Sequence, residues 1–285
     1  MSAAAANTPM EINTVLCVID PTTPDQTVLA PALQAAAGSQ ASLHLYVCVA
    51  ATAATSPKGE SGLAAEKARY QAWLDSMAAP IRRDGVTVTT EVESGSDWRG
   101  AIAPAAERCG AGLIVKASFR HSALQRRLLQ TSDWTLLRAA RCPVLLVKDE
   151  SKTPVASVLA ALNISADDPA HRQLTDRIVG SARYIAEVTG ATLHGANAYK
   201  GSLGFVHPPE LAAKLGIERQ CAHVADTSPE ALLQTIEKGL PNPLIVVGSI
   251  ARSGVSGLVV GNTAERILDS VSSNVLVIIQ DEPAV

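Results

Sequence analysis

The sequence has few aromatic residues and no long block of basic charge. Only 3% of its 285 residues are Phe, Trp or Tyr, and the formal net charge is −3. A stacking platform for bases needs aromatic side chains, and nucleic-acid binding needs a basic surface. The arginine pairs at positions 82–83 and 126–127 are typical of solvated helix faces. We therefore expect no nucleic acid as the main partner.

Cysteine spacing excludes the common zinc and redox patterns. No two of the five cysteines stand at the C-x-x-C spacing, and Cys17 and Cys48 lie in apolar runs where a thiol packs as a small hydrophobe. We assign no metal site, and a reduced compartment fits best. The first ten residues have no signal-peptide pattern, and no apolar run is long enough to cross a bilayer. We predict a cytoplasmic protein with no membrane partner and with residues 1–10 as a disordered lead.

Catalytic signatures are also missing. The six histidines are scattered, and neither H-E-x-x-H nor G-x-S-x-G occurs. His44 and His194 are interpreted as packed, hydrogen-bonded residues. The 167–169 segment, with Asp168 before Pro169, is interpreted as a helix start and not as a metal site. We assign no catalytic residue and no enzyme activity, although a weak ATPase activity stays compatible with the sequence.

What the chain does contain is a long internal repeat. The run 113–117 resembles 244–248, and 143–147 resembles 274–278, both at a separation of 131 positions. The runs 15–20 and 42–48 likewise match 158–163 and 192–198. A period this long indicates a duplicated domain and not a solenoid of small units.

Each half alternates short β-rich runs with Ala-rich segments of helical period. The strand-like runs are nearly continuous hydrophobics, which is typical of parallel strands covered on both faces. Alternating βα units predict an α/β fold with two tandem Rossmann-like domains, each an open five-stranded, mainly parallel sheet with helices on both faces. We predict helices over 25–37, 64–83, 97–108, 168–188, 229–238 and 263–270.

Residues 148–154 are polar and end in proline, which favours a boundary between the halves. We predict domains over 11–149 and 154–281. The last strand of each half, at 144–148 and 275–279, would leave a bare apolar sheet edge. Pairing of these edges within the chain would satisfy both, and a homodimer stays compatible with the sequence. The segment 205–209 is interpreted as a Pro-rich connecting loop, with a lid over a crevice as the alternative.

The segment from Val246 to Leu268 resembles a phosphate cradle. An apolar run is expected to end in a turn at Gly248 and Ser249, and Gly261 would precede a helix that starts near Asn262 and Thr263. Free amides and the dipole at a helix N-terminus suit a phosphate, and glycine permits close approach of the backbone. Helix caps use the same residue types for purely structural reasons.

This loop, together with the order of the elements, resembles the universal stress protein family, most of all its tandem E-type members. The family's fold is adenine nucleotide alpha-hydrolase-like. In its nucleotide-binding members G-x-x-G, nine residues and then G-[S/T] hold the triphosphate. An Asp after the first strand and a small residue after the second hold the adenosine. The resemblance implies a non-catalytic stress-response protein.

Carried over to the second half, the motif falls on Gly248, Ala251, Gly261 and Asn262, and the adenosine positions fall on Asn163 and Ala198. Ser249 and Thr263 complete the expected wall of the crevice. Ala251 replaces the second glycine and Asn262 replaces the hydroxyl residue, which weakens the expectation of ATP binding. No cofactor is assigned outright; ATP or AMP, with Mg²⁺, is the candidate.

The first half departs further from the motif. The glycine positions fall on Ala117, Arg120 and Gln130, although Asp20 is retained. We predict that this half does not bind ATP in the family manner, and that a phosphate would meet only Lys116, Arg120 or Arg126.

Two functions stay open at this point: a module that senses an adenine nucleotide or another phosphate-bearing metabolite, and an interaction scaffold with vestigial crevices. An adenylating enzyme of the same superfold is disfavoured, because residues 20–24 do not form the required S-G-G-x-D-S loop.

Overall fold

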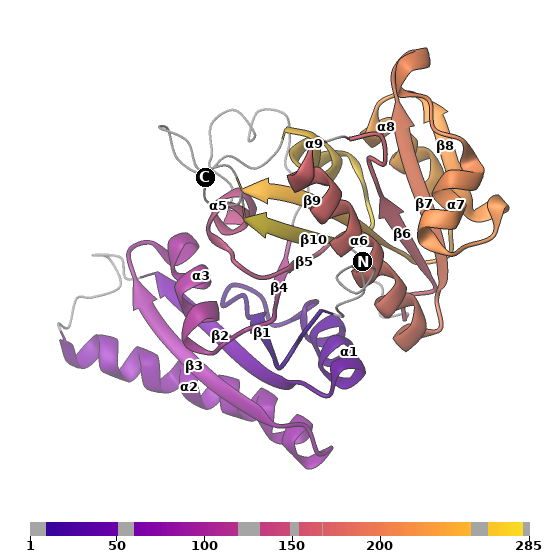
Figure 1. The fold of residues 1–285 in the computed structure, drawn as a ribbon. Helices are drawn as coiled ribbons and strands as arrows, with labels where there is room; N and C mark the ends of the chain where they lie inside the picture. Colours follow the sequence, from indigo (N-terminus) through magenta and orange to yellow (C-terminus); the bar gives the residue numbers. More distant parts are fainter. Residues whose placement is uncertain are drawn as a thin grey trace.

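The computed structural model describes residues 10–50, 60–118, 132–148, 154–166, 168–251 and 262–281. They form a single sheet of ten strands with helices on both faces (Figure 1). The described residues do not include positions 1–9 of the predicted lead or positions 149–153 of the predicted boundary.

Both halves alternate strands and helices. The elements of the first half are β1 (Thr14–Val18), α1 (Leu29–Ser39), β2 (Ser42–Ala50), α2 (Glu60–Arg83), β3 (Val88–Gly95), α3 (Trp98–Arg108), β4 (Leu113–Ala117), α5 (Ser132–Ala139) and β5 (Val144–Val147). Those of the second half are β6 (Ser157–Ala161), α6 (Pro169–Thr189), β7 (Thr192–Tyr199), α7 (Pro208–Leu215), β8 (Ala222–Asp226), α8 (Pro229–Glu237), β9 (Pro243–Ala251), α9 (Asn262–Ser270) and β10 (Asn274–Asp281).

The strand order is β3-β2-β1-β4-β5-β10-β9-β6-β7-β8, so the second half repeats the first in reverse along the sheet. All pairs within a half are parallel, and the antiparallel pair β5–β10 joins the halves. Ala117 pairs with Val147, and Gly248 pairs with Ile278. Both residues of the second pair follow their counterparts by the number of positions that separates the two halves of the repeat. The fold class is therefore the one that the alternating pattern predicts.

Each face of the sheet carries a core that runs through both halves. One core includes side chains of α1, α2, α6 and α7, among them Ala32, Leu74 and Ile178. The other includes side chains of α3, α5, α8 and α9, among them Ile102 and Leu233. Small and branched aliphatic residues let helices pack closely on both faces, which explains the nearly unbroken apolar strands.

Local sequence signals set several helix starts. Ser228 is of a residue type that favours helix caps and stands before Pro229; its hydroxyl accepts a hydrogen bond from the amide of Ala231, and Pro229 opens α8. Asp168 caps α6 in the same way, accepting from the His171 amide at 3.0 Å. Asp168 is therefore the N-cap of this helix, as its position before Pro169 predicts.

Two local predictions are wrong. β9 does not end in a turn at Gly248 and Ser249, because it continues to Ala251, which pairs with Asp281 of β10. The length of β10 provides ladder partners for these extra residues. The segment 205–209 is not loop throughout, because α7 starts at Pro208; two prolines at N1 and N2 fit a helix start.

Side chains also connect the halves. The Lys148 ammonium donates to the carbonyls of Leu268 and Val271 at the end of α9. On the other face, the Tyr184 hydroxyl donates to the carbonyl of Gly38 at 3.1 Å, linking α6 to α1. These contacts accompany the β5–β10 ladder and fix the halves against each other.

Candidate functional site

A cavity of about 620 Å³ lies at the carboxyl ends of the second-half strands. Its walls come from the ends of β6 and β7, from β9, and from the facing sides of α6 and α9. The neighbouring strands β6 and β9 are the point at which strand order reverses, where ligands of doubly wound sheets bind. The lining residues used below are Asn163, His171, Leu174, Thr175, Ile178, Ala198, Tyr199, Lys200, Gly248, Ser249 and Thr263.

The structure brings together five of the eight predicted site residues. Asn163, Ala198, Gly248, Ser249 and Thr263 all line this cavity, although they come from four separate elements or loops. For the other three, the backbone places Ala251 at the end of β9 and Asn262 at the start of α9, and Gly261 lies outside the described residues.

Gly248 has a packing role that its place in the motif did not indicate. A Cβ atom built on it would lie 2.6 Å from Cγ and Cδ2 of Leu174 and 2.8 Å from Cδ1 of Ile178. These distances are too short for real contacts, so α6 could not keep its place against β9 if this residue had a side chain. Glycine is therefore required here even when the cavity is empty.

Ser249 is the most informative polar residue of the cavity. It is only 3% exposed, it lines the cavity, and its hydroxyl has no side-chain hydrogen bond to any described residue. Its hydroxyl is not among the fully buried polar atoms that lack a hydrogen-bond partner, so the cavity leaves it accessible to a ligand. An acceptor supplied by a ligand would satisfy it.

The polar wall of the cavity is neutral or positive. None of the described lining residues is acidic, and Lys200 follows the end of β7. His171 lies on α6 with its Nδ1 2.6 Å from the carboxylate of Asp168, which stands at the helix start. Hydrogen bonds from the backbone amide and the ring of His171 lower the pKa of Asp168. Such a wall accommodates an anion better than a cation.

Sequence analysis missed several of these side chains. Thr175 and His171 share the α6 face that borders the cavity, and Thr175 is 7% exposed. Tyr199 and Lys200 directly follow the predicted Ala198. Thr175 and His171 could have been found from the sequence, because they are polar residues at helical spacing on an otherwise apolar helix face.

The loop after β6 is held by the side-chain amide of a buried asparagine. Asn197 is fully buried, and its Oδ1 accepts a hydrogen bond from the Ile164 amide at 3.0 Å. The Asn163 side chain in turn accepts from Ser165 at 3.0 Å. The strand end that carries Asn163 is thereby fixed at the mouth of the cavity.

The corresponding crevice of the first half is smaller and differently charged. It measures about 290 Å³ and is lined by Asp20, Tyr46, Cys48, Trp98 and Lys116, among others. Asp20 is tied to its own turn, because its carboxylate accepts from the amide and the hydroxyl of Thr22.

Lys116, which lines this first crevice, belongs to a buried ion pair. The Lys116 ammonium is 2.7 Å from Oδ1 of Asp133, and the Ser118 hydroxyl donates to Oδ2 at 2.6 Å. All three residues are no more than 7% exposed. Lys116 therefore already has an anionic partner and is not free to meet a phosphate, which corrects its role as a phosphate contact. Arg120 and Arg126 lie outside the described residues.

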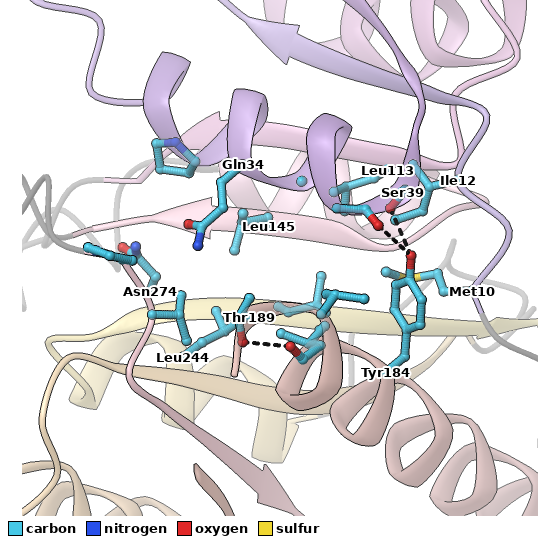
Figure 2. A pocket seen from close by; sticks show the side chains of 18 of the residues that line it. Met10, Ile12, Gln34, Ser39, Leu113, Leu145, Tyr184, Thr189, Leu244 and Asn274 are labelled. Atoms are coloured by element: carbon cyan, nitrogen blue, oxygen red, sulfur yellow. Dashed lines mark hydrogen bonds between the residues drawn. The ribbon is translucent and has the colours of Figure 1, made fainter. Parts of the chain in front are cut away.

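A third cavity, of about 370 Å³, lies between the halves on the α1 and α6 side of the sheet. Figure 2 shows α1 and α6 facing each other across it, with Leu145 and Leu244 on the strands and Tyr184 reaching Ser39 at one end. None of its described lining residues is charged. It therefore offers no counter-charge for a phosphate group.

Three of the described histidines, His44, His194 and His223, pack against other side chains. His44 is 7% exposed and contacts Thr89 at 2.7 Å and Glu91 at 3.2 Å through its two ring nitrogens. His194 stacks on His223, with Nδ1 3.3 Å from the partner's Nε2. Burial lowers the pKa of both stacked rings, and for His194 the neighbouring His223 lowers it further. The interpretation of His44 and His194 as packed residues is confirmed.

Other chemistry is limited in the described part of the chain. No group of three or more metal-ligating side chains occurs there. Burial raises the pKa of the Cys17 thiol well above its usual range, so Cys17 is a core residue and no nucleophile. No described helix is both long and apolar enough to span a bilayer.

Comparison with known proteins identifies the family. The universal stress protein family matches twice, over residues 11–148 and 161–278. The chain belongs to the universal stress protein family. Its tandem relatives include universal stress protein E of Escherichia coli K12, 27% identical with 74% of each chain covered. The corresponding protein of Photorhabdus laumondii is 26% identical over 94% of this chain and 95% of its own.

Solved structures agree with this assignment. A universal stress protein of Pseudomonas aeruginosa UCBPP-PA14 has 29% identity and a TM-score of 0.79, covering 95% of this chain and 94% of its own. One from Archaeoglobus fulgidus, 18% identical with a TM-score of 0.73 over 97% and 99% of the two chains, shares the fold. The resemblance to tandem, E-type members is confirmed, and membership of this family supports a role in the stress response.

Proposed function

We propose that the chain is a non-catalytic stress-response protein whose second half binds a small phosphate-bearing ligand, with an adenine nucleotide as the leading class. The single observation that carries this proposal is the hydroxyl of Ser249, a residue of the cavity wall that makes no side-chain hydrogen bond to the described residues. A phosphate oxygen is a strong acceptor for such a donor.

The shape and charge of the cavity support the same class of ligand. Its volume of about 620 Å³ lies within the range of small-molecule sites. Ser249 and Thr263 provide hydroxyls near the start of α9, where helix amides favour anions, and Lys200 provides a positive charge. Asn163 and Ala198 line the same cavity and are the residues that would contact the base.

No catalytic group accompanies these binding groups. None of the described lining residues is acidic, so no carboxylate of that wall is placed to act as a general base. Ligand occupancy, and not turnover, would then carry the signal. An ion such as Mg²⁺ would have to reach the site with the nucleotide.

Calorimetric titration with ATP, AMP and adenosine, each with and without Mg²⁺, tests this proposal. We expect ATP to bind and Ser249→Ala to weaken it roughly ten- to 150-fold, because a hydrogen bond to a charged group is lost. Ser202→Ala, on the exposed loop after β7, is the matched control and should change nothing. Absence of heat and of any thermal shift with millimolar ATP would overturn the proposal and favour a scaffold with vestigial crevices.

A further inference from the structure

The two halves place a serine at the same point of the sheet. Ser118 directly follows β4, Ser249 lies in β9, and their positions differ by the separation that relates the halves. The strand pairing confirms that the two serines are equivalent. The Ser118 amide donates a hydrogen bond to the carbonyl of Val147, and Ser249 pairs with Ile279. Each serine directly follows a residue of the equivalent pairs Ala117–Val147 and Gly248–Ile278.

The environments of the two hydroxyls differ in one respect. Ser118 donates to the carboxylate of Asp133 at 2.6 Å, whereas Ser249 has no such partner in the described part of the second half. Asp133 lies in the first turn of α5, and its equivalent in the first turn of α9 is Ala264. The equivalent of Lys116 is Val247, which has no charge to offer.

We infer that Asp133 is a built-in anion that occupies, in the first half, the place that the ligand's phosphate takes in the second. Its carboxylate has three supports of the kinds that hold phosphate groups in proteins: a serine hydroxyl, a lysine ammonium and the positive end of a helix. Asp133 is thus the residue that determines specificity, because it closes the first crevice to anionic ligands. This inference rests on the proposed function for what it says of the second half.

The charge balance of the first crevice follows from this assignment. The charged residues of the described lining are Asp20 and Lys116, and since Lys116 is already paired with Asp133, the charge of Asp20 is left without a basic partner in that lining. A phosphate entering there would meet a carboxylate at the helix start and another at the mouth. Removing the carboxylate of Asp133 should therefore expose a phosphate site.

Tryptophan fluorescence can test the first half alone, because all three tryptophans, at positions 73, 98 and 134, lie in it and Trp98 lines its crevice. The probe is inorganic phosphate at constant ionic strength. We expect a saturable fluorescence change for Asp133→Ala and for Asp133→Ser, and none for the wild type. In Lys116→Met/Asp133→Ala the apparent affinity should fall at least tenfold.

Asp133→Ser keeps a small polar partner for Lys116, so it remains informative if Asp133→Ala does not fold. A folded single variant without a phosphate response would overturn the inference, as would a wild type that responds equally or a double variant that binds as tightly as Asp133→Ala. Failure of the proposed function would show instead in the wild-type calorimetry, and it would leave the fluorescence result intact. Ala264→Asp, the reciprocal change, should abolish the second-half binding.

Discussion

The hydroxyl of Ser118 and the carboxylate of Asp133 lie 2.6 Å apart, and both residues are buried. Since Lys116 completes the cluster from the other side, this carboxylate is both desolvated and fully paired. Neutral groups occupy the same positions in the second half. On the inference above, the two crevices of this duplicated fold would differ in their preference for charged ligands.

Removing one partner of this cluster should destabilise the protein strongly. For Asp133→Ala we expect a loss of about 3–5 kcal/mol in the free energy of unfolding, because the Lys116 ammonium is left buried without its counter-charge. Lys116→Met/Asp133→Ala should recover most of the loss. Urea denaturation followed by circular dichroism measures both. If the single variant lost less than the double variant, the pair would not be the source of the effect.

Gly248 should tolerate no side chain, whether or not a ligand is present. Gly248→Ala places a methyl 2.6 Å from Leu174, and we expect overpacking to cost about 1–3 kcal/mol in unfolding free energy. Gly239→Ala is the control, because its added methyl would make only an ordinary 3.6 Å contact. Equal stability of the two variants would show that α6 can shift freely away from β9.

The hydrogen bonds of Tyr184 should contribute to the docking of the halves. Tyr184→Phe removes the bonds from α6 to Gly38 and Ser39 at 3.1 and 3.3 Å. We expect a loss of about 0.5–1.5 kcal/mol in thermal or urea unfolding. Tyr70→Phe, on α2 and packed edge-on to Trp73, serves as the control. A larger loss for the control would contradict this assignment.

Stability should decrease as the solution becomes acidic, and the His194–His223 stack should account for part of the decrease. Burial holds both pKa values below the ordinary 6.5, so the unfolded chain takes up protons first as the pH falls. The contribution of the stack is therefore complete above about pH 6.5 and is lost as the pH falls through the folded-state values.

Denaturation curves between neutral pH and pH 5 provide the measurement. The slope of stability against pH should be shallower in His194→Gln/His223→Gln than in the wild type, whereas His207→Gln, exposed before α7, should leave it unchanged. An unchanged slope in the double variant would exclude the stack as a source.

Much of the fold could be predicted because its signals are local or repeated. Unbroken apolar runs mark the parallel strands, the repeat marks the two halves, and Ser228 with Pro229 marks a helix start that the structure confirms. The end of β9 was predicted wrongly, because only the partner strand β10 determines how far its ladder continues.

The candidate site was predictable in position but not in chemistry. Asn163, Ala198 and Ser249 follow from strand ends and the motif, and they do share one cavity. The clash that requires Gly248 depends on where α6 crosses the sheet. The pairing of Lys116 with Asp133 depends on how α5 docks beside the end of β4, a contact that spacing alone does not reveal.

The stoichiometry of nucleotide binding tests the central claim most directly. Calorimetric titration of the wild-type chain with ATP should give about one ligand per chain, because the second crevice offers the unpartnered Ser249 and the first is closed by Asp133. A stoichiometry of zero would contradict the proposed site in the second half. Two ligands per chain would contradict the closure of the first.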